Sequence, residues 1–198
     1  MKISLTDQKS LLVVVDMING FINQGALADP SINLITPNIT KLVDIYTKHQ
    51  QPVLAFIDAH SEDAIEFQSF PTHCLKSSYE SELIEELLPY KALMTIIEKN
   101  STNGFFAVDF DEYLASLGSL NQIIITGCCT DICVLQFTLT LKTYFNQNDL
   151  KCELIVPKNC VDTFGNEFHD KEHYNLVALD LMRGAGVTVV DSVEVIYE

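Results

Sequence analysis

Residues 122–145 read QIIITGCCTDICVLQFTLTLKTYF, and the pattern of side chains changes in the middle of this stretch. Its first part, residues 122–127, is a short apolar run rich in β-branched residues, which is typical of a strand covered on both faces. Gly127 ends the run and permits a tight turn. Residues 130–145 then form an amphipathic pattern that predicts a helix. A buried strand followed at once by a helix is the repeating unit of a parallel α/β sheet.

The same alternation extends over the rest of the chain. Further apolar runs without polar alternation occupy residues 11–16, 53–58, 93–99, 152–157 and 187–191. Amphipathic stretches between them predict helices at residues 36–49, 78–88, 109–117 and 169–183. We therefore expect one α/β domain over residues 1–198, with a doubly wound, mostly parallel six-stranded sheet and helices on both faces. Two long loops, residues 20–33 and 60–76, are of a length that more often serves function than simple connection.

Composition and charge narrow the class of protein. The chain has 198 residues, of which 47% are apolar, so it can bury enough surface to fold. Its net charge of −15, from 12 Lys and Arg against 27 Asp and Glu, argues against nucleic acid or an anionic membrane as the main partner. No apolar run approaches the ~20 residues of a membrane span, and no cleavage signal follows the first run. We expect a cytoplasmic protein.

The six cysteines raise the question of whether any of them is chemically active. A disulfide framework is not expected, because a domain of this length does not need disulfide bonds for stability and no secretion signal is present. Cys74, Cys128, Cys152 and Cys160 fit the usual role of a free cysteine as a small buried hydrophobe. Cys129 and Cys133 lie in a more suggestive segment, just after the strand at residues 122–127.

Four predicted strands end in a charged or turn-forming residue, namely Asp16, Asp58, Lys99 and Gly127. Any one of them could simply mark the end of a strand. The carboxyl ends of parallel strands, however, are where ligands bind in open α/β sheets. A buried charge costs several kcal/mol unless it is paired, and a pair between Asp16 and Lys99 would satisfy both groups.

Cys133 falls in the first turn of the helix predicted at residues 130–145. There the backbone N–H groups and the helix dipole favour a thiolate, and a neighbouring Lys99 would lower the thiol pKa further. Asp16 could then transfer protons. One alternative is that the cysteines pack a strand–helix junction. A zinc clip formed by Cys129 and Cys133 is less favoured, because no second pair lies nearby.

The loop after the second predicted strand carries a separate group of polar residues. Asp58 and His60 are alternate residues at a strand end and point the same way, so they can share one ion. His73 follows thirteen residues later, with Glu66 between them. Imidazoles and carboxylates without thiolates suit Zn, Fe or Mn. The alternative is an acidic surface loop with two solvated histidines.

These motifs together resemble the isochorismatase-like cysteine hydrolases, and among them the nicotinamidases. The resemblance covers nearly the whole chain in order, through VVVDMINGF, FIDAH, FPTHC, IIEKN and GCCTDICV. The last motif is the most specific, because its Gly-x-x-Thr-Asp-x-Cys-Val pattern identifies Cys133 as the nucleophile. The resemblance implies a triad of Asp16, Lys99 and Cys133, and a non-proline cis peptide between Cys128 and Cys129.

The resemblance also implies a metal and a substrate. Nicotinamidases hold a divalent metal with residues that correspond to Asp58, His60 and His73, and in some members with a carboxylate at the position of Glu66. Zinc is the first expectation, with iron or manganese as alternatives. Ala59 and residues 101–106 depart from the aromatic residues that many nicotinamidases carry, so we expect Phe21 and Phe106 to form the walls around a pyridine ring.

The implied reaction converts nicotinamide and water to nicotinate and ammonia through a thioester on Cys133. The backbone N–H groups of Cys129 and Cys133 would hold the oxyanion. The alternatives are a related cysteine hydrolase acting on another small amide or an isochorismate-type substrate, and a non-catalytic binding protein of the same fold. A small-molecule amide is the expected partner, and a homo-oligomer is expected only by analogy with relatives.

Overall fold

The computed structural model describes residues 1–5 and 9–196, and they form a layered α/β unit. The predicted domain at 1–198 also includes residues 6–8 and 197–198, which lie outside the described residues. The main sheet contains β2 (Ser10–Val15), β3 (Val53–Asp58), β4 (Thr95–Lys99), β5 (Gln122–Cys128), β6 (Glu153–Pro157), β7 (Val161–Asp162) and β8 (Thr188–Val190). Every strand pair in it is parallel, in the order β4-β3-β2-β5-β6-β8, with β7 beside β5.

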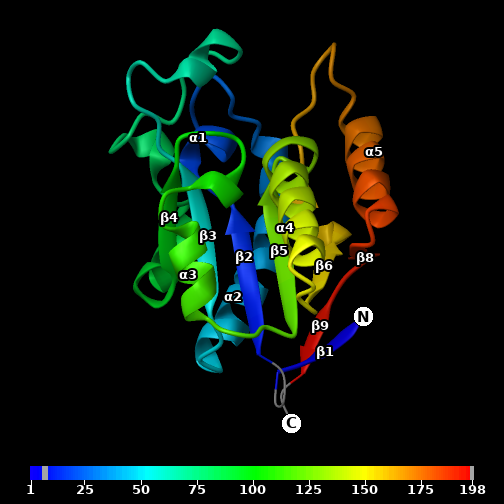
Figure 1. Ribbon diagram of the computed structural model, residues 1–198. Helices are drawn as coiled ribbons and strands as arrows, with labels where there is room; N and C mark the ends of the chain where they lie inside the picture. Colours follow the sequence, from blue (N-terminus) through cyan, green and yellow to red (C-terminus); the bar gives the residue numbers. More distant parts are fainter. Residues whose placement is uncertain (6–8, 197–198) are drawn as a thin grey trace.

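The predicted parallel sheet is confirmed, with seven strands in place of six. The additional strand, β7, has two residues, which is too short to leave a periodic pattern in the sequence. A separate two-stranded sheet pairs β1 (Lys2–Ser4) with β9 (Glu194–Ile196). In Figure 1 the strands β2 and β5 point toward the end of the sheet where α1 (Asn19–Ile22) lies.

Helices cover both faces of the sheet, which explains why the strands lack polar alternation. From β2, the side chains of Leu12 and Val14 pack in the same core cluster as α2 (Thr36–Lys48). Leu11, Val13 and Val15 belong to the opposite cluster, which contains residues of the remaining helices. Those helices are α3 (Phe110–Ser116), α4 (Leu135–Gln147) and α5 (Lys171–Gly184) (Figure 1). None of the described helices has both the length and the apolar composition that a membrane span requires.

The helix predicted at residues 78–88 is wrong. The chain there forms two short 3-10 helices, Tyr79–Ser81 and Glu85–Leu93, on either side of an extended segment. That segment pairs with the residues after β2, because Asn19 N–H donates to the Glu82 carbonyl at 2.9 Å and Ile84 N–H donates to the Met17 carbonyl at 3.2 Å. Tertiary pairing therefore overrides the amphipathic pattern of the segment.

Gly127 is required near the end of β5, where the chain lies against β2 before it turns. Its φ is +110°, and a Cβ at this position would lie 2.0 Å from the carbonyl oxygen of Val15 on the neighbouring strand. The turn leads into a π-helical turn, Thr130–Val134, and then into α4. The cis peptide between Cys128 and Cys129, which the family resemblance implies, is present.

Candidate active site and metal centre

The sheet brings the three predicted catalytic residues to one point. Asp16 follows β2, Lys99 is the last residue of β4, and Cys133 lies in the π-helical turn after β5. Parallel strands end at the same edge of a sheet, so residues far apart in the sequence meet there. All three are buried. Because β3 lies between β2 and β4, its last residue, Asp58, falls between Asp16 and Lys99.

The ammonium group of Lys99 connects this group of residues. Its Nζ lies 2.8 Å from Asp16 Oδ2 and also contacts Asp58 Oδ1. The same Nζ lies 3.9 Å from the Cys133 Sγ and donates to the Ser101 carbonyl at 3.2 Å. Burying a cation costs free energy unless the cation is paired, and the two carboxylates and the thiol around Lys99 provide that pairing.

The pKa values of these groups are shifted by their burial and by one another. Burial raises the pKa of Asp16 to about 7, although the Lys99 charge opposes the shift and the Asp58 charge adds to it. Burial by itself would lower the pKa of Lys99, but the carboxylates of Asp16 and Asp58 hold it well above its ordinary value. Asp16 therefore has a pKa in the range that suits a general base near neutral pH.

The expected lowering of the Cys133 pKa is wrong. Burial raises the pKa of this thiol well above its ordinary value, and the nearby Lys99 charge offsets only part of that rise. Desolvation of the thiolate outweighs the attraction of the ammonium, because the side chain is removed from water. The resting residue is a thiol that needs a base, and Asp16, whose pKa is influenced by both Cys133 and Lys99, is positioned to serve as one.

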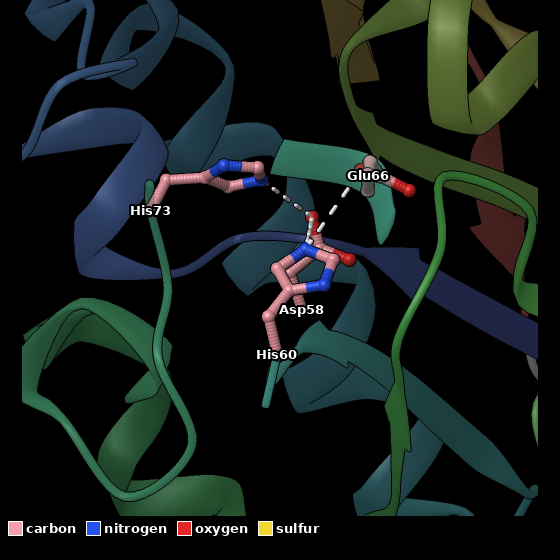
Figure 2. Close-up of side chains that lie close together, drawn as sticks. All are labelled: Asp58, His60, Glu66 and His73. Carbon is pink, nitrogen blue, oxygen red and sulfur yellow. Dashed lines mark ion pairs between the residues drawn. The ribbon is translucent and has the colours of Figure 1, made fainter. Parts of the chain in front are cut away.

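The four predicted metal ligands form a compact cluster beside these residues. Asp58, His60, Glu66 and His73 each offer a ligand atom, and these atoms lie within 4.8 Å of one another. Asp58 Oδ2 lies 3.6 Å from His60 Nε2 and 3.7 Å from His73 Nε2, and Glu66 Oε1 lies 3.8 Å from His60 Nε2 (Figure 2). The four side chains converge on one point, so the solvated-loop alternative does not fit the structure.

The histidine rings are held in the orientation that metal ligands need. His60 Nδ1 lies 3.0 Å from the Asn100 side-chain oxygen, and His73 Nδ1 lies 2.7 Å from the Pro71 carbonyl. Each Nδ1 therefore carries its hydrogen toward an acceptor, and each Nε2 presents a lone pair to the cluster. His60 Nε2 is buried without a hydrogen-bond partner among the described residues. Two imidazole nitrogens and two carboxylates fit a divalent ion such as zinc, iron or manganese.

Asp58 belongs to both groups of residues. Its Oδ1 contacts the Lys99 ammonium, while its Oδ2 faces the two histidines. Burial disfavours its charge, but the positive charge of Lys99, and to a smaller extent the nearby rings of His60 and His73, hold the pKa of this carboxyl below its ordinary value. Glu66 is oriented separately, because its Oε2 accepts a hydrogen bond at 3.1 Å from the backbone N–H of Thr102.

A cavity of about 450 Å³ opens onto the nucleophile and the metal-ligand cluster. Its lining includes Asp58, Glu66, His73, Cys129 and Cys133. The two long loops predicted to be functional supply much of its wall. Residues from them that line the cavity are Phe21, Ala26, Leu27, Ala28, Asp29, Pro30, Glu66, Phe70 and His73.

Of the two residues predicted to form aromatic walls of the substrate site, only one lines the cavity. Phe21 lines the cavity, and its ring centroid lies 5.8 Å from that of His73. Phe106 does not line the cavity; its side chain is 71% exposed and lies over a separate surface hollow with Val108. The short 3-10 helix Gly104–Phe106 buries Gly104 against Phe56 instead, which leaves the ring of Phe106 in solvent.

The aromatic lining comes in part from residues that the sequence did not single out. Phe70 and Phe164 line the cavity, together with Ile132 from the turn that carries Cys133. Phe70 could have been found, because it lies in the loop at residues 60–76 three positions before His73. Phe164 follows the two-residue strand β7, and nothing in the sequence pattern marks its position.

Comparison with known proteins places this arrangement in a family. The pattern of the isochorismatase domain matches residues 10–192 of the chain. The chain belongs to the isochorismatase family. The resemblance seen in the motifs is thereby confirmed, and the protein is a hydrolase of this family.

The chain is also similar to individual proteins of known name. It is 29% identical to Nicotinamidase 1 of Arabidopsis thaliana, over 92% of this chain and 85% of that protein. N-carbamoylsarcosine amidase from Thermoplasma acidophilum superposes with a TM-score of 0.75 at 26% identity, over 92% of this chain and 95% of the other. A pyrazinamidase of Pyrococcus horikoshii in complex with zinc shares the fold, with a TM-score of 0.74 at 23% identity over 92% and 98% of the two chains.

Proposed function

We propose that the protein is a metal-containing cysteine amidohydrolase that converts nicotinamide and water to nicotinate and ammonia. The observation that carries the proposal is the position of Lys99, whose ammonium contacts both Asp16 of the nucleophile site and Asp58 of the metal-ligand cluster. This contact supports a shared site, because the proposed nucleophile and three of the proposed metal ligands line one cavity. The resemblance to Nicotinamidase 1 and to a zinc-containing pyrazinamidase supports the same assignment.

The proposed chemistry begins with proton transfer from Cys133 to Asp16. The thiolate attacks the amide carbon, and the backbone N–H groups of Cys129 and Cys133 hold the oxyanion. Asp16 returns the proton to the departing nitrogen, so that ammonia leaves and a thioester remains. Asp16 then accepts a proton from the attacking water, and the carbon–sulfur bond breaks. Asp16 returns that proton to the sulfur of Cys133, and the carboxylic acid product releases its own proton to solvent to give nicotinate. Lys99 stabilises the negative charges throughout.

The metal has a separate role in this proposal. Asp58, His60, Glu66 and His73 would hold it, and zinc is the first expectation, with iron or manganese as alternatives. When bound, the ion supplies a coordination position for the pyridine nitrogen and so orients the substrate. Phe21 and Phe70 line the same cavity and offer apolar surface to the ring.

The charge of the cavity favours an uncharged amide over an anionic substrate. Asp29, Asp58 and Glu66 are among its lining residues, and none of the described residues that line it is Lys or Arg. An isochorismate-type dianion or a carbamoyl amino acid would bring carboxylates near Asp29, and no Lys or Arg among the described lining residues would pair with them. Nicotinamide carries no net charge, and its anionic product is expected to leave readily.

An ammonia-release assay with several amides tests the proposal. We expect nicotinamide to be hydrolysed faster than a carbamoyl amino acid or a simple aliphatic amide, with loss of at least about 10⁴-fold in the Cys133→Ser variant. Cys152→Ser is the matched control, because Cys152 lies away from the cavity and is half-buried. Metal analysis of the purified protein accompanies the assay. Preferred hydrolysis of an anionic substrate, or full activity in Cys133→Ser, would overturn the assignment.

A further inference from the structure

A second histidine–carboxylate pair lies beside the active site, on the side opposite the metal-ligand cluster. His169 Nε2 lies 2.8 Å from Asp131 Oδ2, and His169 Nδ1 lies 3.0 Å from the Phe164 carbonyl oxygen. Only small fractions of the two side chains are exposed, 13% for His169 and 12% for Asp131. The mechanism above uses neither residue, and Asp131 lies only two residues before the nucleophile.

The ring of His169 is stacked between two aromatic rings. The Phe164 ring lies on one face, with centroids 4.0 Å apart and an interplanar angle of 14°. Tyr174, from α5, lies on the other face at 3.8 Å and 9°. Two nearly parallel stacks and two polar contacts fix the imidazole in position, and through it they fix the ring of Phe164.

Phe164 is the member of this stack that reaches the cavity. It lines the cavity together with Gly165 and Asn166, and so does Ile132 from the nucleophile turn. The loop is attached to the opposite wall as well, because Gly165 N–H donates to Asp29 Oδ2 at 3.0 Å. Phe164 thus presents an aromatic surface to the cavity, which Phe106 does not line.

We propose that His169 is a positioning residue which, by stacking, fixes Phe164 as a specificity-determining aromatic wall of the substrate cavity. The inference rests on the proposed function for the identity of the substrate ring. Aromatic contacts of this kind contribute differences of about three- to tenfold in binding. The stack favours planar aromatic amides over small aliphatic amides, without taking part in the bond-breaking steps.

The kinetic test compares His169→Ala with His173→Ala. His173 is exposed on α5, the helix that carries Tyr174, and its ring contacts only the edge of the Tyr174 ring. Its loss is therefore expected to leave KM and kcat unchanged. In His169→Ala we expect the KM for nicotinamide to rise about three- to tenfold, with kcat unchanged within about twofold. The kcat/KM of an aliphatic amide is expected to stay constant. An unchanged KM, or an equal loss for both amides, would overturn the proposal.

Two further variants separate positioning from general damage to the fold. His169→Phe retains a flat ring between Phe164 and Tyr174, so its KM for nicotinamide is expected to lie closer to the wild-type value than that of His169→Ala. Phe164→Ala is expected to reproduce the rise in KM, and the double variant with His169→Ala is expected to add nothing, because both changes remove the same wall. Additive losses, or no recovery in His169→Phe, would contradict the proposed stacking role.

Alkylation of Cys133 tests the wall without any turnover. The ratio of rate constants for iodoacetanilide and iodoacetamide compares an aromatic with an aliphatic reagent that carries the same reactive group. We expect the ratio to fall about three- to tenfold in His169→Ala and to stay constant in His173→Ala. Fragmentation of the labelled peptide distinguishes Cys133 from Cys129. If wild-type protein does not hydrolyse nicotinamide yet this ratio falls, the assigned reaction is wrong and the role of His169 stands; an unchanged ratio contradicts that role.

Discussion

The nucleophile site and the metal-ligand cluster are adjacent, but their charges are arranged in opposite ways. At the nucleophile site the Lys99 ammonium lies between the carboxylates of Asp16 and Asp58. In the cluster, two carboxylates and two imidazole nitrogens converge with no cationic Lys or Arg among them. The first group is stabilised by its own ion pairs, whereas the second gathers lone pairs toward one point. Asp58 contributes one oxygen to each arrangement.

This difference predicts which parts of the proposed site would depend on a bound ion. Asp16, Lys99 and Cys133 are positioned by strand ends and by their mutual contacts, so their geometry should persist when metal is removed. His73 and Glu66 lie on the loop between β3 and β4, where binding of an ion adds a constraint that the chain itself supplies only in part. Variants that remove one contact at a time can therefore separate the two groups.

The largest effect is expected from Lys99→Met, which removes the cation shared by the two buried carboxylates. Leaving buried charges unpaired costs about 3–5 kcal/mol of stability, and the developing thiolate also loses its counter-charge. We expect the rate of nicotinamide hydrolysis to fall by about 10³-fold or more. Chemical denaturation and single-turnover rates measure the two losses.

Lys76→Met is the matched control for that variant. Lys76 pairs with Glu98 at 2.5 Å, but its side chain is 63% exposed, so its pair contributes at most about 1 kcal/mol. If Lys76→Met lost as much stability as Lys99→Met, burial would not distinguish the contributions of the two ion pairs, contrary to this prediction.

The next effect separates Asp58 from His73. His73→Asn removes a cluster ligand and leaves the Lys99 contacts intact, so metal affinity is expected to fall while the rate of Cys133 alkylation stays near the wild-type value. Asp58→Asn is expected to lower metal affinity and also to change the alkylation rate, because Asp58 contacts Lys99 directly. Metal titration and alkylation kinetics measure both. Identical behaviour of the two variants would contradict the dual role of Asp58.

The meeting of Asp16 and Lys99 was predictable from the sequence because strand position determines it, whereas Cys133 was singled out by its place at a helix start and by the family motif. Asp16 and Lys99 directly follow or end buried strands, and parallel pairing forces such residues to one edge. The cluster was less certain from its residues, because His73 lies in a loop whose path no periodic pattern specifies. The resemblance to the family through FIDAH and FPTHC supplied what spacing could not.

Other features depended on contacts that no local pattern contains. The thiol pKa of Cys133 was expected to be low from its place at a helix start, but complete burial raises it. Phe106 was expected at the substrate where the chain departs from the family pattern, but it is exposed, whereas Phe164, which is stacked on His169, lines the cavity. The pairing of Leu83 with Ile18 likewise overrides a helical pattern. Each of these outcomes is decided by tertiary packing.

A smaller effect is expected when Asn100 is changed. Its side-chain oxygen orients His60 by accepting from Nδ1, and loss of such a partner typically costs 10- to 100-fold in metal affinity, so we expect about that loss in Asn100→Leu. Asn100→Asp keeps an acceptor at this position and is expected to recover most of the affinity. Alkylation of Cys133 serves as the internal reference and should not change in either variant. A loss of affinity in both variants alike would show that Asn100 acts through something other than this hydrogen bond.

The mildest change, a shift of pH, tests how far the two groups influence each other. Asp16 must be ionised to accept the Cys133 proton, and burial raises its pKa from an ordinary value of 3.8 to about 7. Below about pH 7 the carboxyl is mostly neutral, so kcat/KM should fall about tenfold for each further pH unit.

The raised pKa of Asp16 also means that the folded protein holds this proton more tightly than the unfolded chain. Its contribution to stability is therefore full below about pH 4 and is lost as the pH rises to about 7.

The cluster enters this titration through Asp58, whose negative charge is one of the causes that raise the pKa of Asp16. A divalent ion held by Asp58 would offset that charge. In metal-loaded protein the rate of Cys133 alkylation is therefore expected to fall at a lower pH (the acidic limb of its pH profile) than in protein stripped by a chelator. Rates of Cys133 alkylation measured from pH 5 to pH 9 in both forms give the two limbs without requiring turnover. The direction is fixed by the sign of the interaction: removing a negative neighbour makes an acid easier to ionise. If the limbs coincide, the two groups are electrostatically independent, and Asp58 joins them in position only.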